Sequence, residues 1–214
     1  MSVSWSLVGS KEYFDRVAKR WDEMRAGFFS ESLRERAFAV AGVESGRTAV
    51  DVGAGSGFIT EGLVGRGLSV IAVDQSEAML GELKRKLASR GKIDCRVGDA
   101  MMLPLPSSSV DYAFANMCLH HVDSPARAIK EMARVVKSRG KVVITDLEEH
   151  DFGFLREECH DQWLGFKKEY VRRWLKGAGL KGVSVRSTCD RCCAASRCGC
   201  DIASVGIFVA VGEK

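Results

Sequence analysis

The feature that most constrains the fold is a regular alternation of short apolar segments and amphipathic segments through the middle of the chain. Short apolar segments bounded by glycine or polar residues are typical of buried strands, and amphipathic segments at helical spacing are typical of the helices that cover them. Alternation of this kind favours a parallel sheet with helices on both faces. The pattern predicts strands at 47–53, 68–74, 93–99, 110–117 and 141–147, with helices at 57–66, 76–91 and 124–140.

The two ends of the chain depart from this alternation. Helices are predicted at 10–26 and about 30–41, before the first strand, and at 167–178, after the fifth. Two further strands, at 182–188 and 202–212, are joined by only about 13 cysteine-rich residues with no helical pattern. So short a connection suits antiparallel strands, because a parallel crossover needs a dozen or more residues and usually a helix. We therefore expect the last strand to run against the others.

A glycine-rich segment, "VDVGAGSG" at 50–57, follows the first predicted strand and opens the next helix. Gly53, Gly55 and Gly57 allow a sharp turn and a close approach of the backbone to a ligand. The spacing is G-x-G-x-G, with Phe58 where a dinucleotide-binding fingerprint has its third glycine. The glycines alone are therefore a weak signal for the type of ligand.

Two aspartates strengthen that signal, because they end the neighbouring strands. Asp74 ends the second strand, where an acidic residue accepts hydrogen bonds from a ribose diol. Asp99 ends the third strand, where a carboxylate could reach an adenine amino group. A turn or a helix cap would explain either aspartate by itself. Three signals at consecutive strand ends instead favour a ligand with a ribose and an adenine.

These segments resemble the class I S-adenosylmethionine-dependent methyltransferases over about residues 10–147. "VDVGAGSG" is similar to the family's first motif, "VIAVDQSEAML" to its second and "GDAMMLPLP" to its third, and residues 110–146 are similar to the stretch spanning its fourth and fifth strands. The resemblance implies methyl transfer from S-adenosylmethionine. It also implies an α/β fold: a Rossmann-like, doubly wound seven-stranded sheet with strands 1–6 parallel and the last strand antiparallel, under an N-terminal helical cap.

The resemblance further implies a cofactor site. The glycines would line the methionine portion, Asp51 would orient its ammonium group, and Asp74 would bind the ribose hydroxyls. Gln75, Asp99 and Ala100 would lie along the adenine. The predicted cofactor-binding residues are Asp51, Gly53, Gly55, Gly57, Asp74, Gln75, Asp99, Ala100 and Asn116.

The segment "YFDRVAKRWD" at 13–22 resembles the cap helix of the ubiquinone and menaquinone methyltransferase branch. Two interpretations of Tyr13 and Trp21 stay open: they close over the cofactor, or they pack in the core. The chain is accordingly predicted to be one methyltransferase domain, 1–214, with cap helices at 1–44, a cofactor-binding core at 45–147 and a substrate-side segment at 148–214.

The charge and hydropathy of the chain limit which partners it can bind and where in the cell it is expected. The net charge of +4, from 32 basic and 28 acidic residues, is too small to indicate nucleic-acid binding, so we expect a small-molecule substrate. No apolar run approaches the roughly 20 residues of a membrane span, and the opening segment does not resemble a secretion signal. We therefore expect a cytoplasmic location, where clustered cysteines more often bind metal or react than form disulfides. The oligomeric state stays open.

Five of the eight cysteines fall at 189–200, on the connection that joins the last two strands at the cofactor side of the sheet. Three interpretations stay open. The thiolates could hold a structural zinc ion, they could hold a soft metal or metalloid as substrate, as arsenite methyltransferases do, or they could form disulfides. The candidate metal ligands are Cys189, Cys192, Cys193, Cys198 and Cys200.

All four histidines are predicted on the same side of the sheet. An oxygen or nitrogen acceptor usually needs a base, whereas a thiolate or thiolate-bound arsenic needs none. The cysteine-rich side therefore favours a soft acceptor such as a thiol or an arsenite-like metalloid. One alternative is an oxygen, nitrogen or carbon acceptor with the cysteines as a zinc clip; another is a non-catalytic sensor that binds S-adenosylmethionine and metal. The candidate catalytic residues are His120, His121, His150 and His160.

Overall fold

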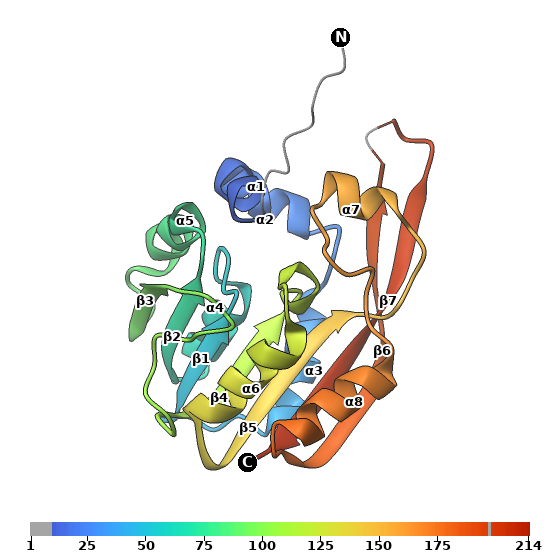
Figure 1. Cartoon of the computed structure of the whole chain (residues 1–214). Helices are drawn as coiled ribbons and strands as arrows, with labels where there is room; N and C mark the ends of the chain where they lie inside the picture. Colours follow the sequence, from blue (N-terminus) through green and yellow to red (C-terminus); the bar gives the residue numbers. More distant parts are fainter. Residues whose placement is uncertain (1–9, 197) are drawn as a thin grey trace.

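The computed structural model describes residues 10–196 and 198–214, and its centre is a seven-stranded sheet in the order β3-β2-β1-β4-β5-β7-β6 (Figure 1). Neighbouring strands among the first five pair in parallel, whereas β7 pairs antiparallel with both β5 and β6. The predicted fold is thereby confirmed. The strands are β1 Thr48–Val52, β2 Ser69–Asp74, β3 Ile93–Val97, β4 Val110–Asn116, β5 Val136–Leu147, β6 Lys181–Ala195 and β7 Ile202–Glu213.

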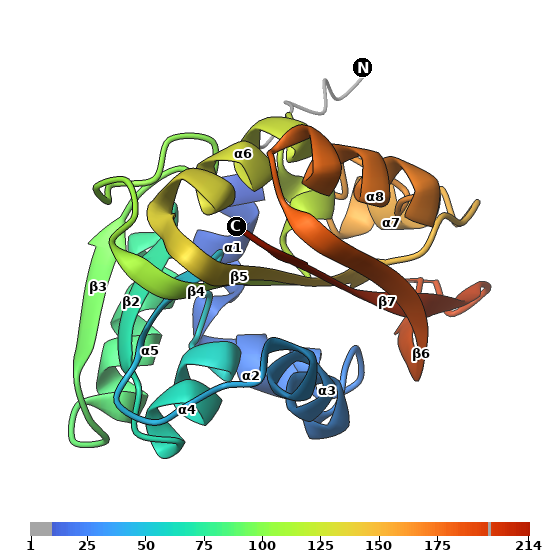
Figure 2. The same cartoon turned by 90° about the horizontal axis from the view of Figure 1, so that it is seen from below.

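Helices cover both faces of the sheet, as Figure 2 shows from below. Helices are needed on both faces because the central strands carry apolar side chains on both sides of the sheet. One face carries α3 (Glu31–Ala41), α4 (Phe58–Gly65) and α5 (Glu77–Leu87). The other carries α6 (Pro125–Val135) and α8 (Lys168–Gly177).

Two buried clusters fill the space between these layers. Phe114, fully buried on β4, packs with Leu33 of α3 and Leu63 of α4 on one face. Phe208 of β7 packs with Leu175 of α8 on the other. Because both faces are sealed, ligands can approach only at the strand ends or over the edges.

The N-terminal cap is in three short pieces where one helix at 10–26 was predicted. They are α1 (Ser10–Val17), the 3-10 turn η1 (Ala18–Arg20) and α2 (Trp21–Arg25). Figure 1 places α1 and α2 over the upper ends of the central strands. Residues 1–9, which include most of the segment examined for a secretion signal, lie outside the described residues.

Two element boundaries correct the sequence prediction. The helix predicted at 124–140 ends at Val135, because Val136 already pairs with Val110 and begins β5. The strand predicted at 182–188 continues to Ala195, because its outer half pairs with β7 up to Ala195 opposite Ile202. The cysteine-rich segment is therefore the outer part of a long hairpin rather than a loop, and Figure 1 shows this hairpin projecting beyond the sheet beside α7 (Phe154–Glu158).

None of the helices in the described part of the chain is long and apolar enough to cross a membrane.

Candidate active site

A cavity of about 300 Å³ lies at the carboxyl ends of the parallel strands, below the cap. Its floor is the turn after β1, where Gly53 and Gly55 adopt positive φ angles of 68° and 52°. The backbone N–H of Gly53 donates to the carbonyl of Val73 at 2.8 Å, which ties this turn to β2. Only glycine adopts such angles readily, and the turn exposes backbone to a ligand as a result.

Two carboxylates, Asp51 and Asp74, face this cavity, and neither forms an ion pair with another described residue. Asp51 is 1% exposed and accepts hydrogen bonds from the backbone N–H and the hydroxyl of Thr60 at 3.0 and 2.7 Å. Burial raises its pKa to about 7. Asp74 accepts from the backbone N–H groups of Gly55 and Ser76, and burial also raises its pKa. Because S-adenosylmethionine carries an ammonium and a sulfonium, these carboxylates fit its charge.

Eight of the nine predicted cofactor-binding residues line this cavity: Asp51, Gly53, Gly55, Asp74, Gln75, Asp99, Ala100 and Asn116. Gly57 is the exception. Its φ is 94°, and a Cβ atom there would lie 2.8 Å from Cγ of Leu83, so its lack of a side chain serves the packing of α4 on α5. Other residues that were not predicted to contact the cofactor also line this cavity, among them Phe14, Met117, Cys118 and Val122.

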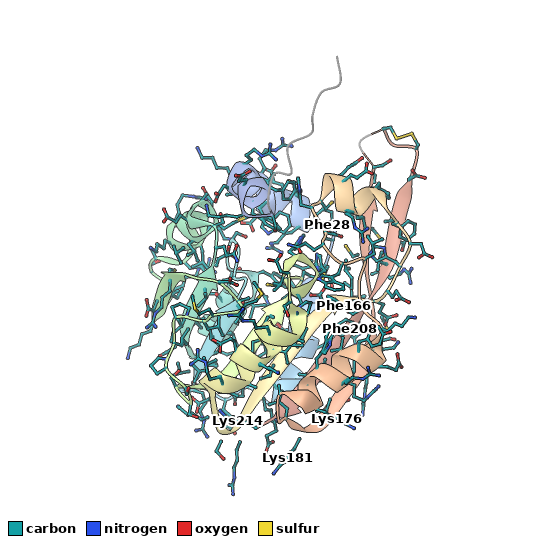
Figure 3. The ribbon with its side chains drawn as sticks, viewed as in Figure 1. Phe28, Phe166, Lys176, Lys181, Phe208 and Lys214 are labelled. Atoms are coloured by element: carbon teal, nitrogen blue, oxygen red, sulfur yellow. A yellow bond between two sulfur atoms is a disulfide. The ribbon has the colours of Figure 1, made fainter. Side chains whose placement is uncertain are left out.

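A second, smaller cavity adjoins the first, because five residues line both: Phe14, Trp21, Phe29, Met117 and His121. Trp21 therefore stands between the two cavities, whereas Tyr13 lines only the second. Phe28 also lines it and lies at the cap end of the molecule, whereas Lys176, Lys181 and Lys214 lie at the opposite end (Figure 3). The second cavity, of about 50 Å³, thus lies beside the first at the cap end of the molecule.

His120 lines this second cavity and is paired with a buried carboxylate that does not itself line it. Nδ1 of His120 lies 2.6 Å from Oδ1 of Asp146, the next-to-last residue of β5, which is completely buried. Asp146 also accepts from the backbone N–H groups of Leu119 and Leu147, both at 2.8 Å. A carboxylate can only accept, so Nδ1 of His120 carries a proton and Nε2 is the atom left to exchange one.

A second carboxylate, Asp161, lies on the other side of His120. Its Oδ1 is 3.8 Å from Nε2 of His120 and from Nδ1 of His121. Burial by itself lowers the pKa of His120, but the charges of Asp146 and Asp161 outweigh it and raise that pKa to about 8. Burial and the charge of His120 hold the pKa of His121 well below its usual value, so His121 is neutral.

The other two candidate bases do not line either cavity. His150 accepts a hydrogen bond from the backbone N–H of Phe152, and its Nε2 is buried without a partner among the described residues. The ring of His160 stacks against Tyr13 with 4.9 Å between centroids, and its carbonyl contacts Nδ1 of His121. Of the four candidates, His120 and His121 line the second cavity, and His120 is the one paired with a carboxylate at hydrogen-bond distance. Its two aspartate neighbours, Asp146 and Asp161, were not predicted.

The structure separates the five clustered cysteines. Cys192 faces inward on β6 and lines the second cavity together with Cys159. Cys189 and Cys193 are exposed. Cys198 and Cys200 are paired as a disulfide at the tip of the hairpin (Figure 3). The described residues thus do not bring the five sulfurs to one point.

Among the described residues, one group of three or more His, Cys, Asp or Glu side chains has its potential ligand atoms within 4.8 Å of one another: His120, His121 and Asp161. Two of its nitrogens already have partners, because Nδ1 of His120 contacts Asp146 and Nδ1 of His121 contacts the carbonyl of His160. We therefore interpret this group as an acid–base cluster.

Comparisons with known proteins agree with this geometry. Residues 50–144 match the methyltransferase domain family. The chain is 35% identical over 146 residues to demethylmenaquinone methyltransferase of Renibacterium salmoninarum, covering 67% of this chain and 60% of that protein. It is 32% identical over 160 residues to the Bacillus licheniformis protein of the same name, covering 69% of each. It also covers 48% of a chloroplastic 2-methyl-6-phytyl-1,4-hydroquinone methyltransferase of Arabidopsis thaliana at 32% identity.

Solved structures show the same fold at low sequence identity. A phosphoethanolamine N-methyltransferase 2 of Haemonchus contortus, bound to phosphomonomethylethanolamine and S-adenosylhomocysteine, aligns with a TM-score of 0.78 at 16% identity, over 97% of this chain and 60% of that one. A methyltransferase in complex with the Trm112 activator of Haloferax volcanii aligns with a TM-score of 0.74 at 21% identity, over 94% and 96%.

Proposed function

The chain belongs to the class I S-adenosylmethionine-dependent methyltransferases, and on that premise we propose that it methylates a small molecule held in the second cavity. The observation that carries this proposal is that His120, in the wall of a cavity that adjoins the predicted cofactor site, is paired with the buried carboxylate of Asp146. S-adenosylmethionine fits the first cavity, where glycines with positive φ and the carboxylates of Asp51 and Asp74 would hold it.

The bound cofactor would supply an activated methyl group, so the protein mainly has to align the acceptor, exclude water and remove a proton. Neutral His120 would take that proton on Nε2 while Asp146 holds Nδ1–H and stabilises the resulting imidazolium. Trp21 and Phe29, which line both cavities, would keep water away from the line between donor and acceptor. The acceptor thus has an oxygen or nitrogen nucleophile that gains from deprotonation.

The test is the formation of S-adenosylhomocysteine with a panel of acceptors: hydroquinone, phenethylamine, and arsenite with a thiol. We expect turnover with an acceptor that carries a proton on its oxygen or nitrogen, as hydroquinone and phenethylamine do. We also expect His120→Gln to lower kcat by about 100-fold or more while cofactor affinity stays unchanged. Full activity after EDTA treatment is expected, because Nδ1 of His120 and Nδ1 of His121 already have protein partners. If the protein binds the cofactor but consumes it with no member of the panel, the proposal is wrong, and the result favours a non-catalytic sensor that binds S-adenosylmethionine.

A second candidate keeps the soft acceptor, because Cys159 and Cys192 both line the second cavity. Two thiols there could hold a thiophilic metal or metalloid beside the methyl donor. Burial opposes this use, because burial together with the charges of Asp161 and Cys159 raises the pKa of Cys192 to about 12. Turnover that depends on arsenite and disappears in Cys192→Ser would favour this candidate.

A zinc clip built from the cysteines of the hairpin stays a prediction with little geometric support, because two of them pair with each other and two are exposed elsewhere on the strand. Zinc analysis of the purified protein tests it. The cytoplasmic location, argued from cysteine usage, also stays a prediction, and fractionation of the source cells tests it.

A further inference from the structure

Asp161 is a nearly buried carboxylate to which none of the described residues donates a hydrogen bond. It is 4% exposed and lines the second cavity. Its nearest nitrogen neighbours, Nε2 of His120 and Nδ1 of His121, lie 3.8 Å from Oδ1, beyond hydrogen-bond reach, and no other described side chain pairs with it. Buried polar groups are almost always paired, and an unpaired carboxylate is costly. A ligand in the cavity would supply the missing donor.

The walls around Asp161 are aromatic. Five rings from the cap line the same cavity: Tyr13, Phe14, Trp21, Phe28 and Phe29. Phe14 and Trp21 meet edge to face with 5.2 Å between centroids, and Trp21 and Phe28 are 6.0 Å apart. The faces of such rings carry partial negative charge and attract cations. Aromatic walls around an unpaired carboxylate are a recognition site for an ammonium group.

The charges around Asp161 also favour a positively charged ligand. The carboxylate of Asp146 is already matched by Nδ1 of His120, whereas Asp161 is matched by no cation in hydrogen-bond contact. Burial raises the pKa of Asp161 to about 6, although the charge of His120 opposes the rise. With His121 held neutral, the cavity has room for one more positive charge. An anionic ligand would instead meet two carboxylates.

We propose that the methyl acceptor is an amine that enters as its ammonium ion, with Asp161 as its anchor and the aromatic rings of the cap around it. This inference rests on the proposed methyl transfer and names its substrate class. The ammonium gives one proton to neutral His120. The neutral nitrogen then forms the N–C bond as the methyl C–S bond breaks, and the electron pair of that bond goes to sulfur. The products are an N-methylammonium ion, S-adenosylhomocysteine and protonated His120, which returns its proton to solvent.

The test compares phenethylamine with 2-phenylethanol, two probes of similar shape that differ in charge. Isothermal titration would use the full chain saturated with S-adenosylhomocysteine, in wild-type form and as Asp161→Asn. We expect the amine to bind at least about tenfold more tightly than the alcohol, and this preference to disappear in Asp161→Asn. The matched control is Asp151→Asn, which removes an exposed carboxylate from the same segment and should keep the preference.

Turnover gives an independent measurement. With phenethylamine as acceptor at about pH 9, where His120 is mostly neutral, Asp161→Asn should raise KM by about tenfold or more. The plateau kcat should stay within about threefold, because the anchor acts on binding and the charge of Asp161 on His120 no longer limits the rate at that pH. Equal binding of the two probes by the wild type, or a preference that survives in Asp161→Asn, would overturn the amine inference. Turnover of hydroquinone or arsenite without amine binding would overturn it too, yet leave methyl transfer standing. Asp161-dependent amine binding without turnover of any acceptor would support the ammonium site and overturn the proposed function.

Discussion

At the residue scale, the proton affinity of His120 is set by the groups packed around it. Asp146 contacts its Nδ1, Asp161 lies near its Nε2, and the neutral rings of His121 and His150 are the other titratable neighbours. Burial lowers the pKa of His120, and the two carboxylates more than compensate, which gives a pKa of about 8. A base must be unprotonated to act, so at neutral pH only a minor fraction of His120 is competent.

The first prediction is the resulting pH profile. Because neutral His120 takes the proton, kcat should rise about tenfold per unit as pH increases toward 8, and level off above that value. Asp146→Asn removes the charge that stabilises the imidazolium, so the inflection should move to lower pH while the plateau falls. Initial rates of S-adenosylhomocysteine formation between pH 5.5 and 9.5, each with saturating cofactor, give the profile. A flat profile would exclude His120 as the base.

The second prediction concerns stability through the same residue. The pKa of His120 is higher in the folded chain than the usual 6.5, so its protonation stabilises the fold. This contribution is complete below about pH 6.5 and is lost as pH rises through about 8. Urea unfolding at pH 6 and pH 9 should therefore show a larger loss of stability at pH 9 in the wild type than in His120→Gln. An equal loss in both proteins would contradict the raised pKa.

At the element scale, the packing of α4 against α5 depends on the absence of a side chain at Gly57. The third prediction is that Gly57→Ala lowers the free energy of unfolding by about 1–3 kcal/mol, because of its positive φ and the contact of the new Cβ with fully buried Leu83. Gly81→Ala is the control: Gly81 lies on the exposed side of α5 with nothing within 4 Å, and the change should add about 0.5–1 kcal/mol. Chemical denaturation measures both. Equal effects would mean that the α4–α5 contact is not as described.

The hairpin of β6 and β7 gives the fourth prediction. Adjacent residues of a strand face opposite sides, so Cys192 is buried and Cys193 is exposed. Burial also raises the pKa of Cys192 to about 12, so little of its thiol is ionised. Iodoacetamide should therefore label Cys193 about 100-fold faster than Cys192 at pH 8. Mass spectrometry of timed digests follows both sites, and unfolding in urea should make the rates converge. Similar rates in the folded chain would mean that β6 does not extend past Cys189 as described.

The same elements show what the sequence could and could not predict. Asp74 and Asp99 line one cavity, as their places near strand ends predict, because parallel strands bring their carboxyl ends to one edge. Asp146 and Asp161 were missed as partners of His120, because the three come from β5, the segment after α7 and η2 (Leu119–His121), whose mutual distances no local pattern encodes. The one available signal was that Asp146 falls at the end of a predicted strand.

The hairpin was mispredicted for a related reason. The cysteine-rich segment has no strong strand or turn pattern of its own. It becomes a strand because β7 pairs with it beyond Ser187, from Arg191 opposite Gly206 to Ala195 opposite Ile202. Cys192 and Cys193 were therefore grouped as ligands of one site, although a strand sends them to opposite faces.

At the scale of the whole molecule, the cap is fastened to the elements that form the cofactor cavity. Asp22 of α2 accepts a hydrogen bond from the hydroxyl of Ser56, in the glycine turn, and pairs with Lys86 of α5, both at 2.6 Å. Asp15 of α1 accepts from the hydroxyl of Ser76, also at 2.6 Å. Each end of the cap thus contacts a cofactor motif. Because the same cap supplies the aromatic walls of the second cavity, it couples the two cavities mechanically.

The fifth prediction tests that coupling. Asp22→Ala removes the contacts with Ser56 and Lys86, which are partly exposed and together contribute about 1 kcal/mol. Cofactor affinity should therefore fall by about fivefold, and amide exchange in residues 10–25 should speed up, whether or not S-adenosylhomocysteine is bound. Glu23→Ala, an exposed neighbour on the same helix, is the control and should change neither quantity. Faster exchange with unchanged cofactor affinity would mean that the cap closes the acceptor cavity alone, and acceptor KM would then be the quantity that Asp22 controls.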